Sequence, residues 1–133
     1  SDALPHDEHS AFRKQVTTQR IIRNTSIGTR VKKMHQFKCQ ICEVRIETVA
    51  GPYAEAAHIR PLGNPHNGPD ALNNILFLCP NCHVRFDRLS IYVEKGAIYL
   101  TSTGEKRGEL RTVRDHNICE EHFAYQRNLC KRQ

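Results

Sequence analysis

The hydrophobic positions of this chain fall into short groups whose spacing predicts both helices and strands. Near the N-terminus, apolar residues recur at helical spacing with basic residues between them, which predicts a basic amphipathic helix over residues 8–23. Residues 24–28 are expected to break this helix, and residues 29–35 to form a second, short one.

Two apolar stretches on either side of a long loop predict the central strands. Residues 44–48 and 53–59 are expected to be strands around a Gly-Pro turn at 51–52. Residues 61–70 contain three prolines and two glycines, so they are expected to be an extended loop. The compact apolar run at 75–78 then predicts the returning strand.

The second half of the chain predicts further elements of both kinds. Residues 83–89 are expected to form a helix, and residues 91–93 and 98–100 a β-hairpin. Residues 102–116 are polar and are expected to be irregular, before a final helix closes the chain. Helices and strands mixed in this order predict an α+β fold.

Composition limits the functions open to this chain. Its 133 residues favour one domain, and 20 Lys and Arg against 14 Asp and Glu give a formal charge of +6, which favours a polyanionic partner. The chain has neither an apolar run of the roughly 20 residues that span a membrane nor a signal-peptide pattern, so we expect an intracellular, cytoplasmic protein. The first residue is not Met, which leaves open that the chain is a fragment.

Four of the six cysteines form two CxxC pairs, Cys39 with Cys42 and Cys79 with Cys82, separated by the 36 residues 43–78. A two-residue gap lets both sulfurs of a pair bind one ion across a tight turn, so two pairs can complete a tetrahedral site. We therefore expect a closed four-cysteine site with structural zinc. Two disulfides, or two unrelated redox or buried pairs, are the alternatives.

The other two cysteines, Cys119 and Cys130, lie in the final predicted helix, which Asn117 and Glu120 are expected to open as a capping box. Their separation places both thiols on one helix face about 16 Å apart, too far for a disulfide or a shared ion. We expect them to be small core residues.

Three polar residues lie where the predicted elements converge. His58 ends a strand before the long loop, Asn74 begins the returning strand, and His83 directly follows the last cysteine of the zinc site. In a strand–loop–strand–helix unit closed by zinc, the end of the first strand and the start of the helix face each other. We therefore expect two imidazoles and an amide around one small cleft.

The segments around these residues carry a family resemblance. Residues 55–62 read EAAHIRPL and residues 74–83 read NILFLCPNCH, and with the two CxxC pairs this pattern resembles an HNH endonuclease. It is most similar to the HNH domain of SRA-HNH modification-dependent restriction enzymes, over roughly residues 20–130. The resemblance implies an α+β fold with a zinc-stapled ββα-metal (His-Me finger) core, flanking N- and C-terminal helices and an extra β-hairpin. It divides the chain into residues 1–28, a tail and helix or a linker from a missing upstream domain, and residues 29–133, the nuclease domain.

The resemblance also implies a role for each residue of the motif. His58 is similar to the general base that takes a proton from the attacking water, and Asn74 to the amide that braces the loop. Asn73 is a neighbouring competitor, but the family spacing of five residues before the cysteine selects Asn74. His83 is similar to a ligand of a catalytic divalent ion, Mg²⁺ or Mn²⁺ by default, although an imidazole also accepts Co²⁺, Ni²⁺ or Zn²⁺. Without these roles, the three would be a buried histidine, a turn residue and a neighbour of the zinc site.

One position departs from the family pattern. Many relatives carry Asp or His immediately before the general base as a second metal ligand, where this chain has Ala57. Asp87, four residues after His83 on the same helix face, is the candidate replacement. It is otherwise a helix-end cap or the partner of a neighbouring arginine. Glu55 is a weaker candidate, because strand alternation turns it away from His58.

Basic residues beside the motif are expected to contact DNA. Arg60, Arg85 and Arg88 would hold phosphates without reading bases, and further arginines between residues 107 and 114 would extend the track. The expected partner is double-stranded DNA. An upstream DNA-reader domain in a parent chain and a homodimer are left open, and no membrane is expected.

Two functions of different classes follow from these residues. The first is a metal-dependent DNA endonuclease of the restriction type, with His58 as base and a divalent ion at His83, which leaves 5′-phosphate and 3′-hydroxyl ends as the family implies. The second, motivated by Ala57, is a catalytically silent zinc-stabilised module that binds nucleic acid. A purely structural role in an assembly would leave the paired imidazoles without a purpose. Plasmid cleavage distinguishes the first function from the others.

Overall fold

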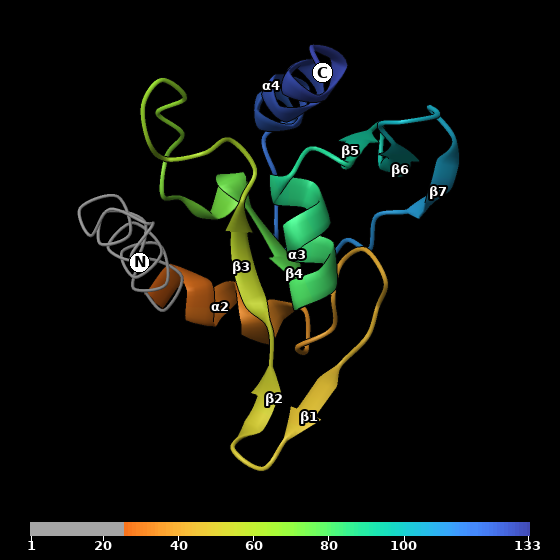
Figure 1. The fold of residues 1–133 in the computed structure, drawn as a ribbon. Coiled ribbons are helices and arrows are strands. Elements are labelled where there is room, and N and C mark those ends of the chain that lie inside the picture. The colour runs from red at the N-terminus through yellow and green to blue at the C-terminus, as the bar shows by residue number, and fades with distance from the viewer. Residues whose placement is uncertain (1–25) are drawn as a thin grey trace, which may run out of the picture.

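A pair of antiparallel strands followed by a helix forms the centre of the fold. β3 (Glu55–His58) pairs with β4 (Ile75–Leu78), and α3 (Pro80–Asp87) follows β4 and lies beside the pair (Figure 1). A 3₁₀ turn, η1 (Leu72–Asn74), leads from the long loop into β4. This computed structural model describes residues 26–133, and within them the expected α+β fold with a ββα core is confirmed.

β4 is buried along its whole length, which explains its continuous apolar sequence. Its side chains alternate between two hydrophobic clusters on opposite faces of the strand pair. Phe77 belongs to one cluster with Val31 of α2 (Ser26–Met34), and Leu76 to the other with Phe86 of α3. Burying one side chain of this size contributes about 1.5–3 kcal/mol, so this strand connects the two parts of the core.

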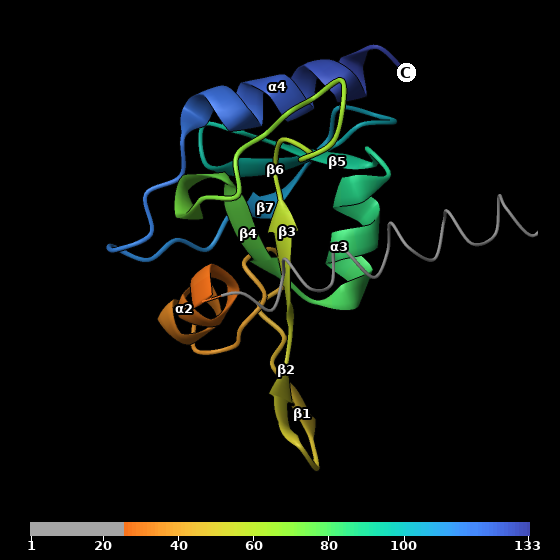
Figure 2. The same cartoon turned by 90° about the vertical axis from the view of Figure 1, so that its left-hand side faces the viewer.

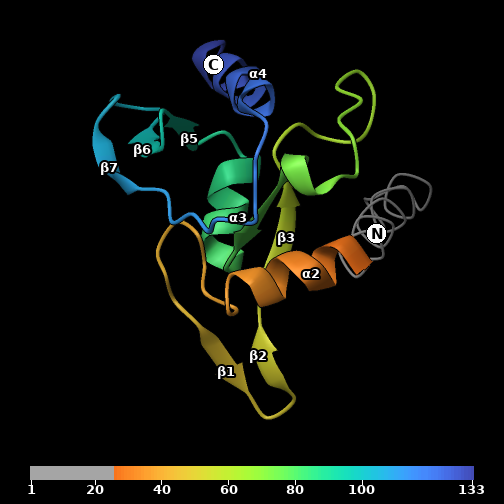
Figure 3. The ribbon, with the colours of Figure 1, turned by 180° about the vertical axis from the view of Figure 1, so that it is seen from behind.

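α2 covers the rear of the β3–β4 pair (Figure 3) and begins earlier than expected. Residues 26–28 were predicted to separate two helices, but they form the first turn of α2, and Gly28 is buried in it. Glycine is a poor helix former, but packing of this face on the strands outweighs the local preference. The proposed boundary after residue 28 therefore falls within a helix. The helix expected over residues 8–23 lies outside the described residues.

A β-hairpin extends away from the body of the fold below β3 (Figure 1). Its strands, β1 (Ile46–Thr48) and β2 (Gly51–Tyr53), meet at a turn over residues 49–50. The Gly-Pro pair at 51–52 is thus in a strand and is not the predicted turn, and the strand expected over residues 53–59 is divided between β2 and β3. The Thr48 hydroxyl donates to the Gly51 carbonyl and accepts from the Ala50 backbone amide. These bonds close the turn at residues 49–50, before the predicted turn at 51–52.

α3 begins at Pro80 and not at His83, the predicted start. Cys79 is the N-cap, and its sulfur accepts a hydrogen bond from the backbone amide of Cys82 at 3.4 Å. Proline at the first position of a helix already has the backbone angle that the helix requires. The second CxxC pair is therefore the N-terminus of the helix itself, with His83 at the end of the first turn.

A three-stranded sheet and a C-terminal helix complete the described chain. β5 (Ile91–Glu94) and β6 (Ala97–Leu100) form the predicted hairpin, and β7 (Lys106–Glu109) adds a strand where an irregular segment was expected. The side chains of β7 are mostly exposed and polar, so no apolar pattern could predict it. α4 (Glu120–Lys131) lies across this sheet, against β5 (Figure 2).

The start of α4 also differs from the prediction. Its N-cap is Cys119 and not Asn117, and the Cys119 side chain makes no capping hydrogen bond. Cys119 is therefore partly exposed at the end of the helix, whereas Cys130 is buried, with its thiol 3.6 Å from the carbonyl oxygen of Ile91. Only Cys130 is the core residue that we expected. Within residues 26–133, no helix is both long and apolar enough to cross a membrane.

Candidate metal centre and active site

The two CxxC pairs meet at one point. The sulfurs of Cys39, Cys42, Cys79 and Cys82 all lie within 4.8 Å of one another. The sulfurs of Cys42 and Cys79 are 3.7 Å apart, close to the roughly 3.8 Å that separates two ligands of a tetrahedral zinc ion. The sulfurs of a disulfide are about 2.05 Å apart, and all four cysteines are free. The disulfide alternative is therefore wrong, and the cluster could hold a zinc ion.

The environment of the four sulfurs also suits a cation. The backbone amide of Ile41 donates to the Cys39 sulfur at 3.4 Å, as the Cys82 amide does to Cys79. A hydrogen bond from the Cys82 thiol lowers the pKa of Cys39 to about 4, and the same pairing raises the pKa of Cys82. Negative sulfurs this close repel one another, so the four thiols can ionise together only around a positive ion.

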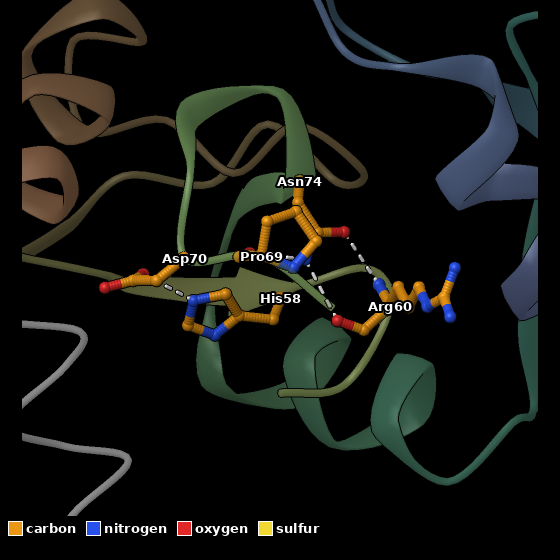
Figure 4. A network of polar contacts seen from close by, with 5 residues as sticks. All are labelled: His58, Arg60, Pro69, Asp70 and Asn74. Carbon is orange, nitrogen blue, oxygen red and sulfur yellow. Dashed lines mark hydrogen bonds and ion pairs between the residues drawn. The ribbon is translucent and has the colours of Figure 1, made fainter. Parts of the chain in front are cut away.

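His58 lies at the end of β3 and contacts an aspartate at the far end of the long loop. Its Nε2 is 2.8 Å from Oδ1 of Asp70 (Figure 4), and its side chain is only 9% exposed. The carboxylate fixes the orientation of the imidazole and leaves Nδ1 on the side of the ring away from Asp70. The loop between β3 and β4 must fold back on itself for this contact to form.

Asn74 joins the two ends of the same loop. Its side-chain amide donates to the carbonyls of Arg60 (3.0 Å) and Pro69 (2.8 Å), and its oxygen accepts from the Arg60 backbone amide (2.8 Å) (Figure 4). Asn74 is completely buried, whereas the neighbouring Asn73 is exposed. The structure thus places Asn74, and not Asn73, at the position that braces the loop beside Asp70.

His83 lies between two carboxylates. Its Nδ1 is 2.6 Å from Oε1 of Glu55, and its Nε2 is 3.0 Å from Oδ2 of Asp87, one helical turn away. An imidazole nitrogen beside a carboxylate oxygen is a common donor set for divalent ions, so the pair of His83 and Asp87 fits such an ion. Glu55, the weaker candidate in the sequence, contacts His83 directly because it lies on the face of β3 that looks toward α3.

His58 and Asp87 line one cavity of about 240 Å³. The rest of its wall comes from the long loop, from α3 and the residues after it, and from α4. It is formed by Ile59, Pro61, Leu62, Phe86, Leu89, Gln126 and Leu129. His83 is not in the lining of this cavity, but its Nε2 lies 3.0 Å from Asp87, which is; Asp87 therefore links His83 to the cavity that His58 lines.

The three arginines expected to contact DNA have different surroundings. Arg85 and Arg88 are exposed on α3 and at its end. Arg60 is partly buried, with its guanidinium carbon 4.3 Å from the centre of the Tyr125 ring and its Nε donating to the His66 carbonyl at 2.6 Å. Arg60 therefore connects the long loop to α4, a role that we did not expect.

Two residues contact the candidate site residues in ways that the sequence did not predict: Asp70, which it did not indicate, and Glu55, which it indicated only as a weaker candidate. Asp70 lies in a loop rich in proline and glycine, and only the folded loop brings it to His58. Strand parity could have indicated Glu55, because it shares a face of β3 with Ala57, the position of a metal ligand in many relatives.

Comparisons with known proteins agree with this geometry. A family model described as HNH endonuclease matches residues 39–94. Among solved structures, the chain is similar to a modification-dependent TagI restriction endonuclease, with 44% sequence identity and a TM-score of 0.73. The match covers 75% of this chain and 35% of that one, so the chain spans about a third of this relative. No curated protein matches this chain.

Proposed function

We propose that this chain is the DNA-cleaving part of a restriction-type endonuclease, because an HNH endonuclease family model matches residues 39–94 and the chain is similar to a restriction endonuclease. The observation that carries the proposal is the cavity that His58 and Asp87 share, with His83 Nε2 3.0 Å from Asp87 Oδ2 beside it. Phosphodiester hydrolysis requires a base and metal-binding side chains near one reacting atom. The cavity is lined by the candidate base His58 and by Asp87, and His83 lies in contact with Asp87.

Two metal sites belong to the proposal. The four-cysteine cluster would hold a structural zinc ion, since thiolates at these distances suit tetrahedral zinc. His83 and Asp87 would hold a catalytic divalent ion, Mg²⁺ or Mn²⁺, and the imidazole also accepts other transition ions. Such an ion, when bound, neutralises charge on the scissile phosphate and stabilises the departing oxygen.

His58 is the general base of the proposed reaction. With Nε2 held by Asp70, Nδ1 takes a proton from the attacking water, and the carboxylate stabilises the imidazolium that forms. The water oxygen forms a bond to phosphorus as the bond between phosphorus and the 3′ oxygen breaks. The 3′ oxygen takes up a proton, so the products are 5′-phosphate and 3′-hydroxyl ends.

Asn74 acts on the reaction through the loop. By donating to the Pro69 carbonyl and closing the loop on Arg60, it places the neighbouring Asp70 within reach of His58. It is therefore a positioning residue and does not touch the substrate.

Double-stranded DNA is the proposed substrate. The formal charge of +6 and the exposed Arg85 and Arg88 on the helix that carries Asp87 favour contact with phosphates. The chain spans only part of TagI, which is described as modification-dependent. We therefore propose that a reader domain elsewhere in a parent chain selects the cleavage site.

Cleavage of a supercoiled plasmid tests this function. In the presence of Mg²⁺ or Mn²⁺, we expect His58→Ala to lower the cleavage rate by about 10²- to 10⁴-fold, the usual contribution of a general base. Agarose gels resolve the nicked and linear products over time. His122→Ala, on α4 and outside the lining of the cavity, is the matched control and should cleave at nearly the original rate.

Two results would count against the endonuclease. Equal rates for the original chain and His58→Ala would show that His58 is not the base. DNA binding without cleavage under any divalent ion would favour the second candidate, a zinc-stabilised nucleic-acid-binding module. That candidate is supported by Ala57, which removes one metal ligand that many relatives have.

A further inference from the structure

A series of hydrogen bonds reaches His83 on the side of its ring away from Asp87. The Tyr53 hydroxyl donates to Oε2 of Glu55 at 2.6 Å, and Oε1 of the same carboxylate is 2.6 Å from His83 Nδ1. The side chains of Glu55 and His83 are 21% and 5% exposed, so their contact is largely shielded from water. An ionised carboxylate only accepts hydrogen bonds, so Nδ1 of His83 is the donor.

The other ring nitrogen lies beside Asp87. Nε2 of His83 lies 3.0 Å from Oδ2 of Asp87, which lines the same cavity as His58. With the proton on Nδ1, the lone pair that can bind a metal ion is on Nε2. The two nitrogens point to different sides of the ring, so an ion held by Nε2 and Asp87 lies on the opposite side from Glu55.

We propose that Glu55 is the positioning residue of the catalytic metal site and that it acts through His83, without contacting the ion. It fixes the ring so that Nε2 faces the ion, and Tyr53 fixes the carboxylate in turn. A carboxylate behind a metal-binding histidine typically changes metal affinity by about 10- to 100-fold. This inference rests on the proposed function, because it concerns the ion that His83 and Asp87 would hold.

The orientation of His83 is especially important in this chain because its set of ligands is small. Many relatives have a further metal ligand where this chain has Ala57. We therefore assign only two side chains, His83 and Asp87, to the ion. Glu55 and Ala57 lie on the same face of β3. From that face, the longer Glu55 side chain reaches His83 on α3, the helix that carries both ligands.

Titration with Mn²⁺ alone tests the inference, with electron paramagnetic resonance of the free ion as the readout and the zinc-loaded chain as the sample. We expect Glu55→Ala to weaken Mn²⁺ binding by about 10- to 100-fold. Glu55→Gln keeps an oxygen that accepts from Nδ1 and should restore most of the affinity. Glu47→Gln removes an exposed carboxylate that pairs only with Arg45 among the contacts of the hairpin, and it should bind as the original chain does. Zinc content and the urea midpoint are measured for every variant, since a merely structural role would change those and not the affinity.

The outcomes separate this inference from the function it depends on. If Glu55→Ala binds Mn²⁺ as tightly as the original chain, Glu55 has no role at the site. If Glu55→Gln loses as much affinity as Glu55→Ala, the negative charge itself binds the ion, which overturns the positioning role while the endonuclease stands. If the original chain binds Mn²⁺ no better than Asp87→Ala does and cleaves no DNA, the proposed function fails and this inference fails with it.

Discussion

At the scale of single residues, the geometry of the site depends on a buried amide and a glycine in one loop. Asn74 donates twice and accepts once, and only an amide side chain offers both kinds of group in that arrangement. Gly68 makes the loop compact, because a Cβ at this position would collide with the Arg60 carbonyl. These two residues hold the end of the loop that presents Asp70 to His58.

Asn74→Asp tests this arrangement with almost no change of shape. The variant leaves the partly buried carbonyls of Arg60 and Pro69 without this donor and turns a carboxylate toward them. We expect the free energy of unfolding to fall by at least about 1–3 kcal/mol, the cost of an unsatisfied buried polar group. Urea denaturation measures that change, and plasmid cleavage should fall because Asp70 is displaced.

Asn73→Asp is the matched control, because Asn73 is the adjacent residue and is exposed. It makes the same chemical change where water can solvate the new charge, so we expect little effect on stability. If the two variants lost equal stability, the buried hydrogen bonds of Asn74 would not be what holds the loop.

At the scale of elements, α3 connects the two proposed metal sites. It begins at the second cysteine pair and carries His83 and Asp87 within the next turns. An α-helix rises about 1.5 Å per residue with little freedom. The position of the cysteine cluster therefore determines where His83 and Asp87 lie relative to β3.

Cys82→Ser tests this dependence. Removing one of four thiolates opens a closed metal site, and the binding energy of such an ion contributes directly to folding. We expect the variant to lose its zinc and its cooperative unfolding transition, as measured by elemental analysis and circular dichroism. Cys119→Ser, at a partly exposed thiol outside the cluster, should keep both. A Cys82→Ser protein that stays folded with a full zinc content would contradict the structural role of the cluster.

At the scale of the whole molecule, a buried polar network joins segments far apart in the sequence. Arg111 Nη1 is 3.3 Å from His35 Nδ1, His35 Nε2 is 2.8 Å from His116 Nδ1, and His116 Nε2 is 3.0 Å from the Leu72 carbonyl oxygen. Because arginine only donates and a carbonyl only accepts, each imidazole carries its single proton on Nε2. The network requires both histidines to be neutral, and it connects the residue after α2 to the turn before β4.

This requirement makes stability depend on pH. Burial lowers the pKa of His35 to about 4, assisted by His116 and Arg111, and burial also lowers the pKa of His116. In the unfolded chain a histidine titrates near pH 6.5, so below that value the unfolded chain binds protons that the folded chain does not. The stability present above pH 6.5 is therefore lost as the pH falls toward 4.

Urea denaturation from about pH 7.5 to about pH 4.5 should show this loss of stability. Acid also protonates thiols that bind zinc, so the comparison needs a variant with the same cysteines. His35→Gln keeps hydrogen-bonding groups but does not titrate, and we expect its stability to fall less steeply with pH. The same pH dependence in both proteins would exclude His35 as the source.

The sequence by itself determined the features that depend on short spacings along the chain. Two residues between cysteines are enough to predict that each pair turns its sulfurs to one point, and the three residues between His83 and Asp87 place both on one helix face. The unbroken apolar run of β4 predicted the returning strand. The order of His58, Asn74 and His83 around these elements was sufficient to indicate a resemblance to HNH endonucleases, which the family match over residues 39–94 supports, while their roles in the reaction stay predictions.

Tertiary structure alone decided the features that depend on contacts across longer stretches. Asp70 reaches His58 across 12 residues, and Glu55 reaches His83 across 28, so neither contact leaves a periodic pattern in the sequence. β7 and the division of the strand expected over residues 53–59 likewise depend on which neighbouring backbone is available to pair. The physical reason is that local spacing sets the direction of a side chain within one turn or strand, whereas packing of the whole chain selects what that side chain meets.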